Sequence, residues 1–357
     1  MNKYKCVGLD VRQAPTSILD RILIIKSSRA LFPVRAALLL APFVVYLGAP
    51  STTPALQTPQ TPLQGPHQPT SDLITLDVVV NGPGESFVRG LNKSDFSVYD
   101  NNVLQEITSF SNDDGPLSIC FVLDISGPIG GPQHIKSFGK RFGVLSQAAA
   151  RFVQVSHQSN QYFVIPFNER PHVLVDGVDS NTVLAEIDKL DSLHLKGSTA
   201  LYDACSFALE KVVRGAHSRK AIILISDGND SASKTAPSKL ERLLKEKAVP
   251  LYAMNVQPPT EIEVSGFPEA PLEEWAKMSG GLAFRSKNIK DLVEGLGVIA
   301  QELRNRYRLS FKPKTSPGDK KWHKIKVAVT LPAGAPRSLT RVIARSQQGY
   351  YAGTSNR

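Results

Sequence analysis

Two unbroken apolar runs, at 118–123 and 220–226, constrain the fold of this chain more than any other feature. The first reads SICFVL and the second KAIILIS, and neither alternates between polar and apolar residues. A strand without that alternation is buried on both faces, which is typical of a mostly parallel sheet covered by helices on either side. Segments between and after these runs predict two further strands, at 161–166 and 250–256, and helices at 135–156, 182–190, 200–213, 239–247 and 289–304. We therefore predict a doubly wound α/β domain over residues 116–304.

The segments on either side of this region have a different pattern. Apolar and polar residues alternate at 73–80, 96–99, 103–110, 307–311, 323–330 and 339–344. Strict alternation with Gly, Asn and Asp between the runs predicts antiparallel strands that have one face in water. Because a sheet of two or three strands is marginal alone, we expect residues 72–115 and 305–352 to pack together as a small β-sandwich. The α/β domain would be inserted between them, and residues 353–357 would form a tail.

The first 71 residues have the composition of targeting and tether segments. Residues 1–49 carry seven basic and two acidic residues, and a short apolar stretch follows the basic leader. This is the order of an export signal or, where the segment is retained, of a membrane anchor. Residues 50–71 are rich in Pro and Thr and are predicted to be an extended linker. We expect an exported protein, periplasmic, at the cell surface or secreted, with membrane contact only through residues 1–49.

Cysteine usage adds a weaker constraint on the compartment. Cys120 lies in the first apolar run, and Cys205 lies in a segment with helical spacing. We expect two buried free thiols. A disulfide between them is the alternative that an exported protein allows.

Acidic and hydroxyl side chains gather where the buried strands end. Asp124 and Ser126 follow the first apolar run, Asp227 follows the second, and Thr199 opens a helix after a glycine turn. The carboxyl ends of parallel strands meet at one edge of a sheet, and ligands lie beyond that edge. Carboxylate and hydroxyl oxygens suit Mg²⁺ or Mn²⁺ rather than zinc. These four residues are the predicted metal site.

Their pattern resembles the metal-ion-dependent adhesion site of von Willebrand factor A (VWA) domains, DxSxS…T…D. The resemblance implies that Asp124, Ser126, Thr199 and Asp227 hold a divalent cation, which then takes a carboxylate from a protein partner. One position departs from the motif, because Pro128 replaces the second serine and offers neither a hydroxyl nor an N–H. The site is therefore predicted to be degenerate, and a structural scaffold without metal is the alternative.

The flanking segments extend the resemblance over nearly the whole chain that follows the linker. Residues 88–99, 307–311 and 349–352 resemble the bacterial VWFA-related family of the acidobacterial type. The family implies an exported module for adhesion or protein–protein interaction that is not an enzyme.

Motifs of enzymes fit the same residues less well. Residues 127–131 lack the Gly-Lys-Ser/Thr ending of a phosphate loop, and Ser126 does not lie in a G-x-S-x-G elbow. The histidines form no zinc-binding pair. A hydrolase remains an alternative if a histidine lies close to Ser126 in space. Asp203 and Asp230 are expected to cap helix and turn backbone rather than to bind metal.

Basic residues are concentrated after the α/β region. Twelve lie within residues 304–345, against a single acid. Arg306 with Arg308, and Lys324 with Lys326, have period-two spacing and are expected to share a strand face. A solvated sheet face is the first interpretation. The alternative is an envelope-associated protein that binds a polyanion through these four residues, with an anionic envelope component favoured over nucleic acid.

Overall fold

A computed structural model of the 357-residue chain describes residues 6–7, 73–127, 141–187, 189–190, 197–256, 270–286, 288–314, 321–336, 339 and 341–352. The predicted export segment (apart from residues 6–7), the linker, Pro128 and the predicted tail lie outside the described residues. The chain divides into two compact units, one of residues 1–8 with 70–357 and the other of residues 9–69, and every described element belongs to the first. Among the described helices, none combines the length and the apolar character that a membrane span requires.

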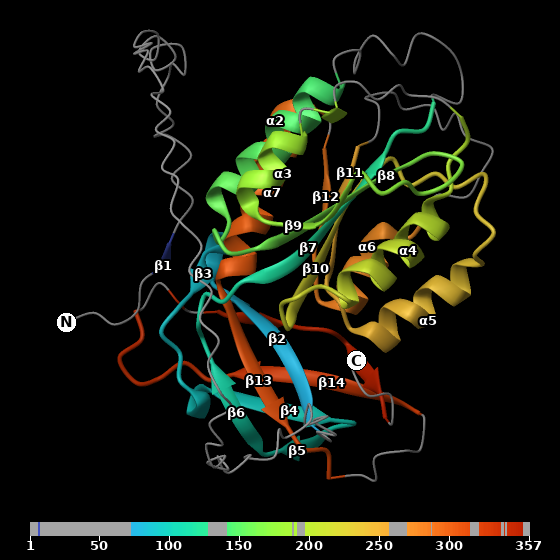
Figure 1. The fold of residues 1–357 in the computed structure, drawn as a ribbon. Helices are drawn as coiled ribbons and strands as arrows, with labels where there is room; N and C mark the ends of the chain where they lie inside the picture. The colour runs from blue at the N-terminus through green and yellow to red at the C-terminus, as the bar shows by residue number, and fades with distance from the viewer. Residues whose placement is uncertain are drawn as a thin grey trace, which may run out of the picture. The chain divides into compact units, whose positions relative to one another are not determined.

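A six-stranded sheet lies at the centre of the α/β region (Figure 1). Its strand order is β12-β11-β10-β7-β8-β9, and only the β8–β9 pair is antiparallel. The strands are β7 (Leu117–Asp124), β8 (Gln161–Phe167), β9 (Val175–Val178), β10 (Arg219–Ser226), β11 (Leu251–Asn255) and β12 (Ala283–Arg285). The two unbroken apolar runs, at 118–123 and 220–226, thus lie in neighbouring central strands.

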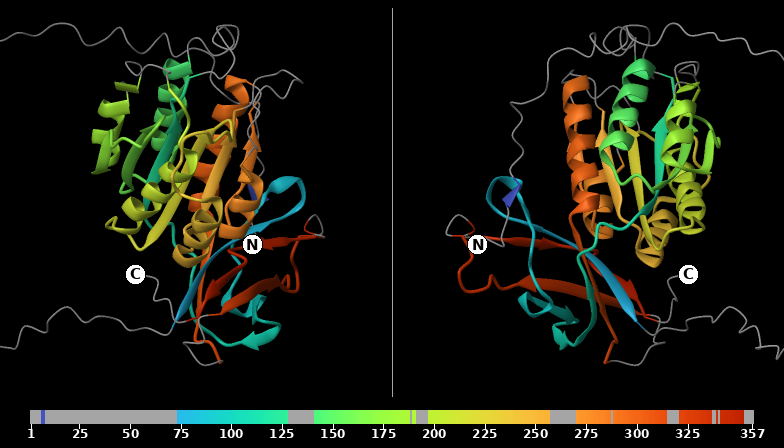
Figure 2. Two further views of the ribbon diagram at one scale, coloured as in Figure 1. Left: turned by 90° about the vertical axis from the view of Figure 1, so that its right-hand side faces the viewer. Right: turned by 60° about the vertical axis from the view of Figure 1, so that its left-hand side comes forward.

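Helices cover both faces of this sheet (Figures 1 and 2). One face packs against α2 (Arg141–Val155), α3 (Ser180–Ile187) and α7 (Ile289–Arg304). The other packs against α4 (Leu201–Val213), α5 (Pro237–Lys247) and α6 (Leu272–Ser279). The predicted doubly wound α/β fold is confirmed.

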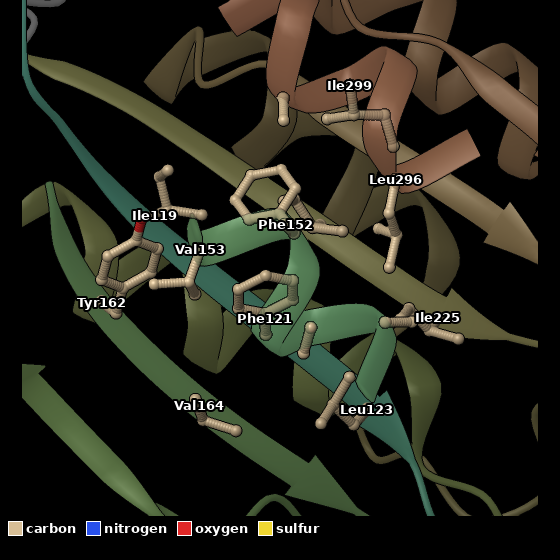
Figure 3. Close-up of a cluster of buried hydrophobic side chains, with 14 of the residues drawn as sticks. Ile119, Phe121, Leu123, Phe152, Val153, Tyr162, Val164, Ile225, Leu296 and Ile299 are labelled. Carbon is tan, nitrogen blue, oxygen red and sulfur yellow. The ribbon is translucent and has the colours of Figure 1, made fainter. Parts of the chain in front are cut away.

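The side chains of β7 show why the strand has no polar alternation. Ile119, Phe121 and Leu123 point into the first helical layer, where the ring of Phe121 meets that of Phe152 edge-on with centroids 5.2 Å apart (Figure 3). Cys120 faces the second layer, together with Cys205. Both thiols are buried and free, so each is a small apolar filler of that core.

Two antiparallel sheets are built from the segments on either side of the α/β region. The larger has the order β1-β3-β2-β13-β6 with β15 on β2, and the smaller has the order β16-β14-β4-β5. The larger sheet comprises β1 (Cys6–Val7), β2 (Ile74–Asn81), β3 (Phe87–Val88), β6 (Ile107–Ser111), β13 (Arg306–Phe311) and β15 (Ile343–Arg345). The smaller comprises β4 (Phe96–Asp100), β5 (Val103–Gln105), β14 (Trp322–Val329) and β16 (Gly349–Tyr351).

Each sheet contains strands from both the N-terminal and the C-terminal segment, paired side by side. β2 pairs with β13, and β4 pairs with β14. One apolar core lies between the sheets, with Leu76 and Tyr307 from the larger and Phe96 and Ile325 from the smaller. The segments that precede and follow the α/β region in the sequence therefore build one β-sandwich.

One strand prediction is wrong. Residues 103–110 form two strands, β5 and β6, which belong to different sheets and are separated by Glu106. β5 buries the polar Gln105 and exposes Val103 and Leu104, whereas β6 buries Ile107, so the apolar residues of the two strands do not share one environment. The pattern therefore does not reveal where the chain passes from one sheet to the other.

Candidate metal centre

The four predicted metal-site residues lie at the carboxyl edge of the parallel sheet. Asp124 is the last residue of β7, and Ser126 follows two residues later. Asp227 comes directly after β10, which is the neighbour of β7, and Thr199 lies just before α4. The topology thus brings all four from three separate loops to one edge.

Backbone hydrogen bonds join these loops. Gly127 N donates to Gly197 O at 3.0 Å, which connects the first loop to the second. Ser231 N donates to Thr199 O at 2.8 Å, and Thr199 N donates to the Ser231 hydroxyl at 3.0 Å, which connects the second to the third. The loops therefore hold one another in place through protein atoms alone.

Asp124 is the hub of the side-chain arrangement. Its Oδ1 accepts from the Ser126 hydroxyl at 2.6 Å and from Ser126 N at 3.0 Å. Its Oδ2 accepts from the Ser226 hydroxyl at 2.7 Å. Ser226 is a site residue that the sequence pattern did not single out, because its position at the end of an apolar strand also fits a core residue.

The environment of Asp124 disfavours its negative charge. Burial raises the pKa of Asp124 to about 6, and the nearby charge of Asp227 adds to the effect, while the bonds from Ser126 and Ser226 oppose it. Two ionised carboxylates close together repel each other, and a cation bound between them would be stabilised by both charges.

The donor atoms fit a hard divalent cation. A hydroxyl that gives its proton to a carboxylate keeps its lone pairs for another ligand, and Ser126 is in that state. Thr199 is 1% exposed, and in the described part of the chain its hydroxyl has no hydrogen-bond partner. Asp227 Oδ1 accepts from Asn229 N at 3.0 Å. The described ranges contain no cluster of three or more His, Cys, Asp or Glu that could hold a metal, so a cation here depends on hydroxyl ligands.

Asp203 and Asp230 accept hydrogen bonds from the protein, as expected of capping residues. Asp203 accepts from the backbone N–H groups of Lys234 and Thr235, at 3.0 and 2.8 Å. Asp230 accepts from Tyr202 N in the first turn of α4, at 3.3 Å, and also from the Ser233 hydroxyl at 2.6 Å. These bonds fix the loop after β10 against α4.

Among the described histidines, none hydrogen-bonds to Ser126. His67, His134 and His194 lie outside the described residues. The Ser126 hydroxyl is bonded to a carboxylate instead, which orients it but does not take its proton at neutral pH.

The four residues predicted to bind a polyanion do not form one surface. Arg306 and Arg308 lie on β13 in the larger sheet, whereas Lys324 and Lys326 lie on β14 in the smaller. Arg306 is 4% exposed, so its assignment to a basic surface is corrected. The period-two pattern gives the face of a strand but not whether another element covers that face.

Arg306 belongs instead to a buried charge network between α7 and the sandwich. Its Nη1 is 3.5 Å from Asp77 Oδ2 and its Nη2 is 3.9 Å from Glu302 Oε1. Glu302 has no exposed surface and also accepts from the Tyr252 hydroxyl and from Arg345. Burial raises the pKa of Tyr252, so the phenol stays protonated as a donor.

Arg345 ties the same network to the end of α6. Its Nη1 donates to Gly280 O and Gly281 O, both at 2.9 Å. A side chain at Gly281 would place Cβ 1.9 Å from Leu251 O, so only glycine allows this approach.

A family model described as the von Willebrand factor type A domain matches residues 118–296. An aerotolerance-related membrane protein from Bacteroides fragilis, with multiple mutations to serines, is 18% identical over 52% of this chain and 98% of that chain, with a TM-score of 0.41. A von Willebrand factor type A structure from Catenulispora acidiphila is 11% identical over 72% of each chain, with a TM-score of 0.44. Proximal thread matrix protein 1 from the mussel byssus is 18% identical over 57% of this chain and 51% of that chain, with a TM-score of 0.46. No curated protein matches the chain.

Proposed function

The chain belongs to the von Willebrand factor type A domain family, and from that premise we propose that it binds a protein partner through a divalent cation held at the carboxyl edge of its sheet. Domains of this family typically mediate protein–protein interactions and often bind a divalent metal at this edge. Asp124, Ser126, Thr199 and Asp227 would hold the ion, and Mg²⁺ or Mn²⁺ suits their oxygen atoms. The bound ion would supply a positive contact for a carboxylate of the partner.

The arrangement around Asp124 carries the proposal. Two serine hydroxyls orient both of its oxygens, and the charge of Asp227 lies near enough to raise its pKa. This pre-organisation has a cost without a cation, because ionised carboxylates repel one another in a partly buried place. A bound cation removes that repulsion. The ligand atoms are therefore already positioned to bind it.

We further propose that the module is displayed outside the cytoplasm and catalyses no reaction. The basic leader with its short apolar stretch, followed by the Pro- and Thr-rich segment, supports export and tethering. The bond from the Ser126 hydroxyl to Asp124 supports a ligand role for Ser126 rather than a nucleophilic one. The proposed partner is therefore extracellular or in the envelope, and adhesion is the proposed outcome.

Calorimetric titration of the full chain with MnCl₂ tests the cation site. We expect saturable binding to one site, competition by Mg²⁺, and loss of binding in Asp124→Asn, which keeps the shape of the side chain but removes its charge. Glu273→Gln is the control, because that carboxylate is 74% exposed at the other side of α6 from the sheet core. Absence of saturable binding in the unmodified chain would refute the proposal in favour of a metal-free scaffold.

A further inference from the structure

The hairpin between β4 and β5 presents apolar side chains at the edge of the smaller sheet. β5 is the last strand of that sheet, and its consecutive residues Val103 and Leu104 are 49% and 51% exposed. An edge strand is normally protected by charge or by a covering element, because its apolar residues and free backbone groups favour association. Successive residues of a strand point to opposite faces, so Leu104 lies on the outer face with Tyr99 and Val103 lies on the other face, and both border the free edge of β5.

Lysines surround this apolar edge. Leu104 lies opposite Tyr99 on β4, and Tyr99 lies opposite Lys326 on β14. Residues two apart on a strand share a face, so Lys324 lies on the same side of the sheet as Lys326. From the loop after β13, Lys314 Nζ donates to Leu104 O at 3.0 Å. Tyr99, Leu104, Lys314, Lys324 and Lys326 thus lie on or beside the outer face, and with Val103 at the free edge of β5 they make up the tip patch.

The turn holds the tip patch in a fixed shape. Asn101 and Asn102 have φ of 47° and 67°, which is the geometry of a tight two-residue hairpin turn. Asn101 N donates to Lys324 O and Lys324 N donates to Asn101 Oδ1, both at 2.9 Å. The turn is therefore anchored directly beside one of the lysines.

The charge of the tip patch is positive on its outer side. Lys314, Lys324 and Lys326 are exposed, and the described residues provide no ion-pair partner for them. Asp100, at the end of β4, points inward instead, where it accepts from the Tyr350 hydroxyl at 2.8 Å and contacts His323 Nδ1 at 2.9 Å. Glu106 is the exposed acid that follows β5, so the cations are in excess.

We propose that the tip patch docks on the surface of a bilayer that contains anionic lipids. With the free edge of β5 toward the bilayer, Val103 and Leu104 would enter the interface from the two faces of the strand, and Tyr99 suits the boundary between apolar and polar layers. The three lysines would lie at the negatively charged head groups, each adding to the attraction. A soluble polyanion would engage the lysines but gives the exposed aliphatic pair no role. From the sequence alone, we expected membrane contact only through residues 1–49, and the tip patch would be a second contact. It requires no cation at Asp124.

Co-sedimentation of the full chain with vesicles tests the proposal, because any contribution of residues 1–49 is then common to all variants. We expect binding to phosphatidylcholine–phosphatidylglycerol vesicles to exceed binding to pure phosphatidylcholine, to fall with salt and to be unaffected by chelator. Lys324→Gln combined with Lys326→Gln should lower the partition coefficient about thirty-fold. Leu104→Asp should lower it about tenfold.

Matched variants separate docking from general changes of charge or hydropathy. Lys239→Gln combined with Lys290→Gln removes two charges on helices of the α/β domain, and Ile343→Asp alters a residue that is 58% exposed on the larger sheet. Both controls should bind as the unmodified chain does, and circular dichroism checks that every variant is folded. Equal partition of the tip-patch variants and their controls would overturn the proposal. So would Leu104→Asp binding normally while dextran sulfate captures the chain, since the partner would then be a soluble polyanion.

Discussion

The buried charge network at the end of α7 provides a quantitative test of the structure. Glu302 is the acceptor at its centre and is buried. Replacing it by Gln preserves the side-chain shape and one hydrogen-bonding oxygen, but it removes the negative charge that faces Arg306 and Arg345. Asp77 would be the one acidic partner of Arg306 left among the described residues, at 3.5 Å.

The expected loss of stability follows from burial. The side chains of Glu302 and Arg306 are each 1% exposed, so neither charge can recover its hydration when the other is removed. Removing one member of such a buried pair costs about 3–5 kcal/mol. Glu294→Gln is the matched control on the same helix, since Glu294 is 49% exposed and lies 3.7 Å from Lys290. Its loss should be roughly 0.3–0.5 kcal/mol.

Urea unfolding followed by circular dichroism measures both variants. The variants are compared only where the slope of the free energy of unfolding against urea concentration is the same, because a shift of the midpoint then reports a change in stability. Glu302→Met combined with Arg306→Met should be less destabilised than Glu302→Gln, because the two most deeply buried charges are removed together. Asp77 keeps Arg308 at 3.9 Å, and Arg345 keeps its bonds to the carbonyls of Gly280 and Gly281. A loss below about 1 kcal/mol for Glu302→Gln would refute the reasoning, since it would mean that water or another group already compensates the arginines.

Three further outcomes are expected. Apparent Mn²⁺ affinity should fall about tenfold from pH 7 to pH 5, because Asp124, with a pKa of about 6, must lose its proton to bind the ion. Calorimetry at the two pH values measures the change. Equal affinities would contradict the assigned role of Asp124. Gly281→Ala should lower the free energy of unfolding by about 2 kcal/mol or more, since its Cβ would lie 1.9 Å from Leu251 O. Gly297→Ala within α7 meets no atom within 4 Å and should instead raise it by roughly 0.5–1 kcal/mol in the same urea assay.

The central strands were predictable from the sequence because burial on both faces leaves a direct mark on it. β7 and β10 have apolar residues at successive positions, which no half-exposed strand tolerates. The shorter elements leave no such mark. β9 and β12 at the sheet edges have four and three residues, and α6 has eight, so the sequence pattern did not predict them. Their periodicity is too brief to separate from loop composition.

The candidate site divides in the same way. Asp124, Ser126, Thr199 and Asp227 were found because a motif spaces them along the chain, and the topology brings them to one edge. Ser226 and Ser231 act through contacts across 102 and 32 residues of sequence, which spacing does not encode. Arg306 was misplaced because burial by another layer of the molecule is a property of tertiary structure alone.

The route by which the chain enters and leaves the α/β domain has a mechanical consequence. It enters from the end of β6 and returns into the start of β13, and these strands are antiparallel neighbours. Tension applied by a partner at the opposite edge of the domain would pass into the sandwich through both strands together. Each strand would be pulled along its own length and in the same direction, so the hydrogen bonds of β13 to β2 would resist in shear and share the force. An adhesive contact on this domain would therefore pull against a row of bonds acting together rather than peel them one after another.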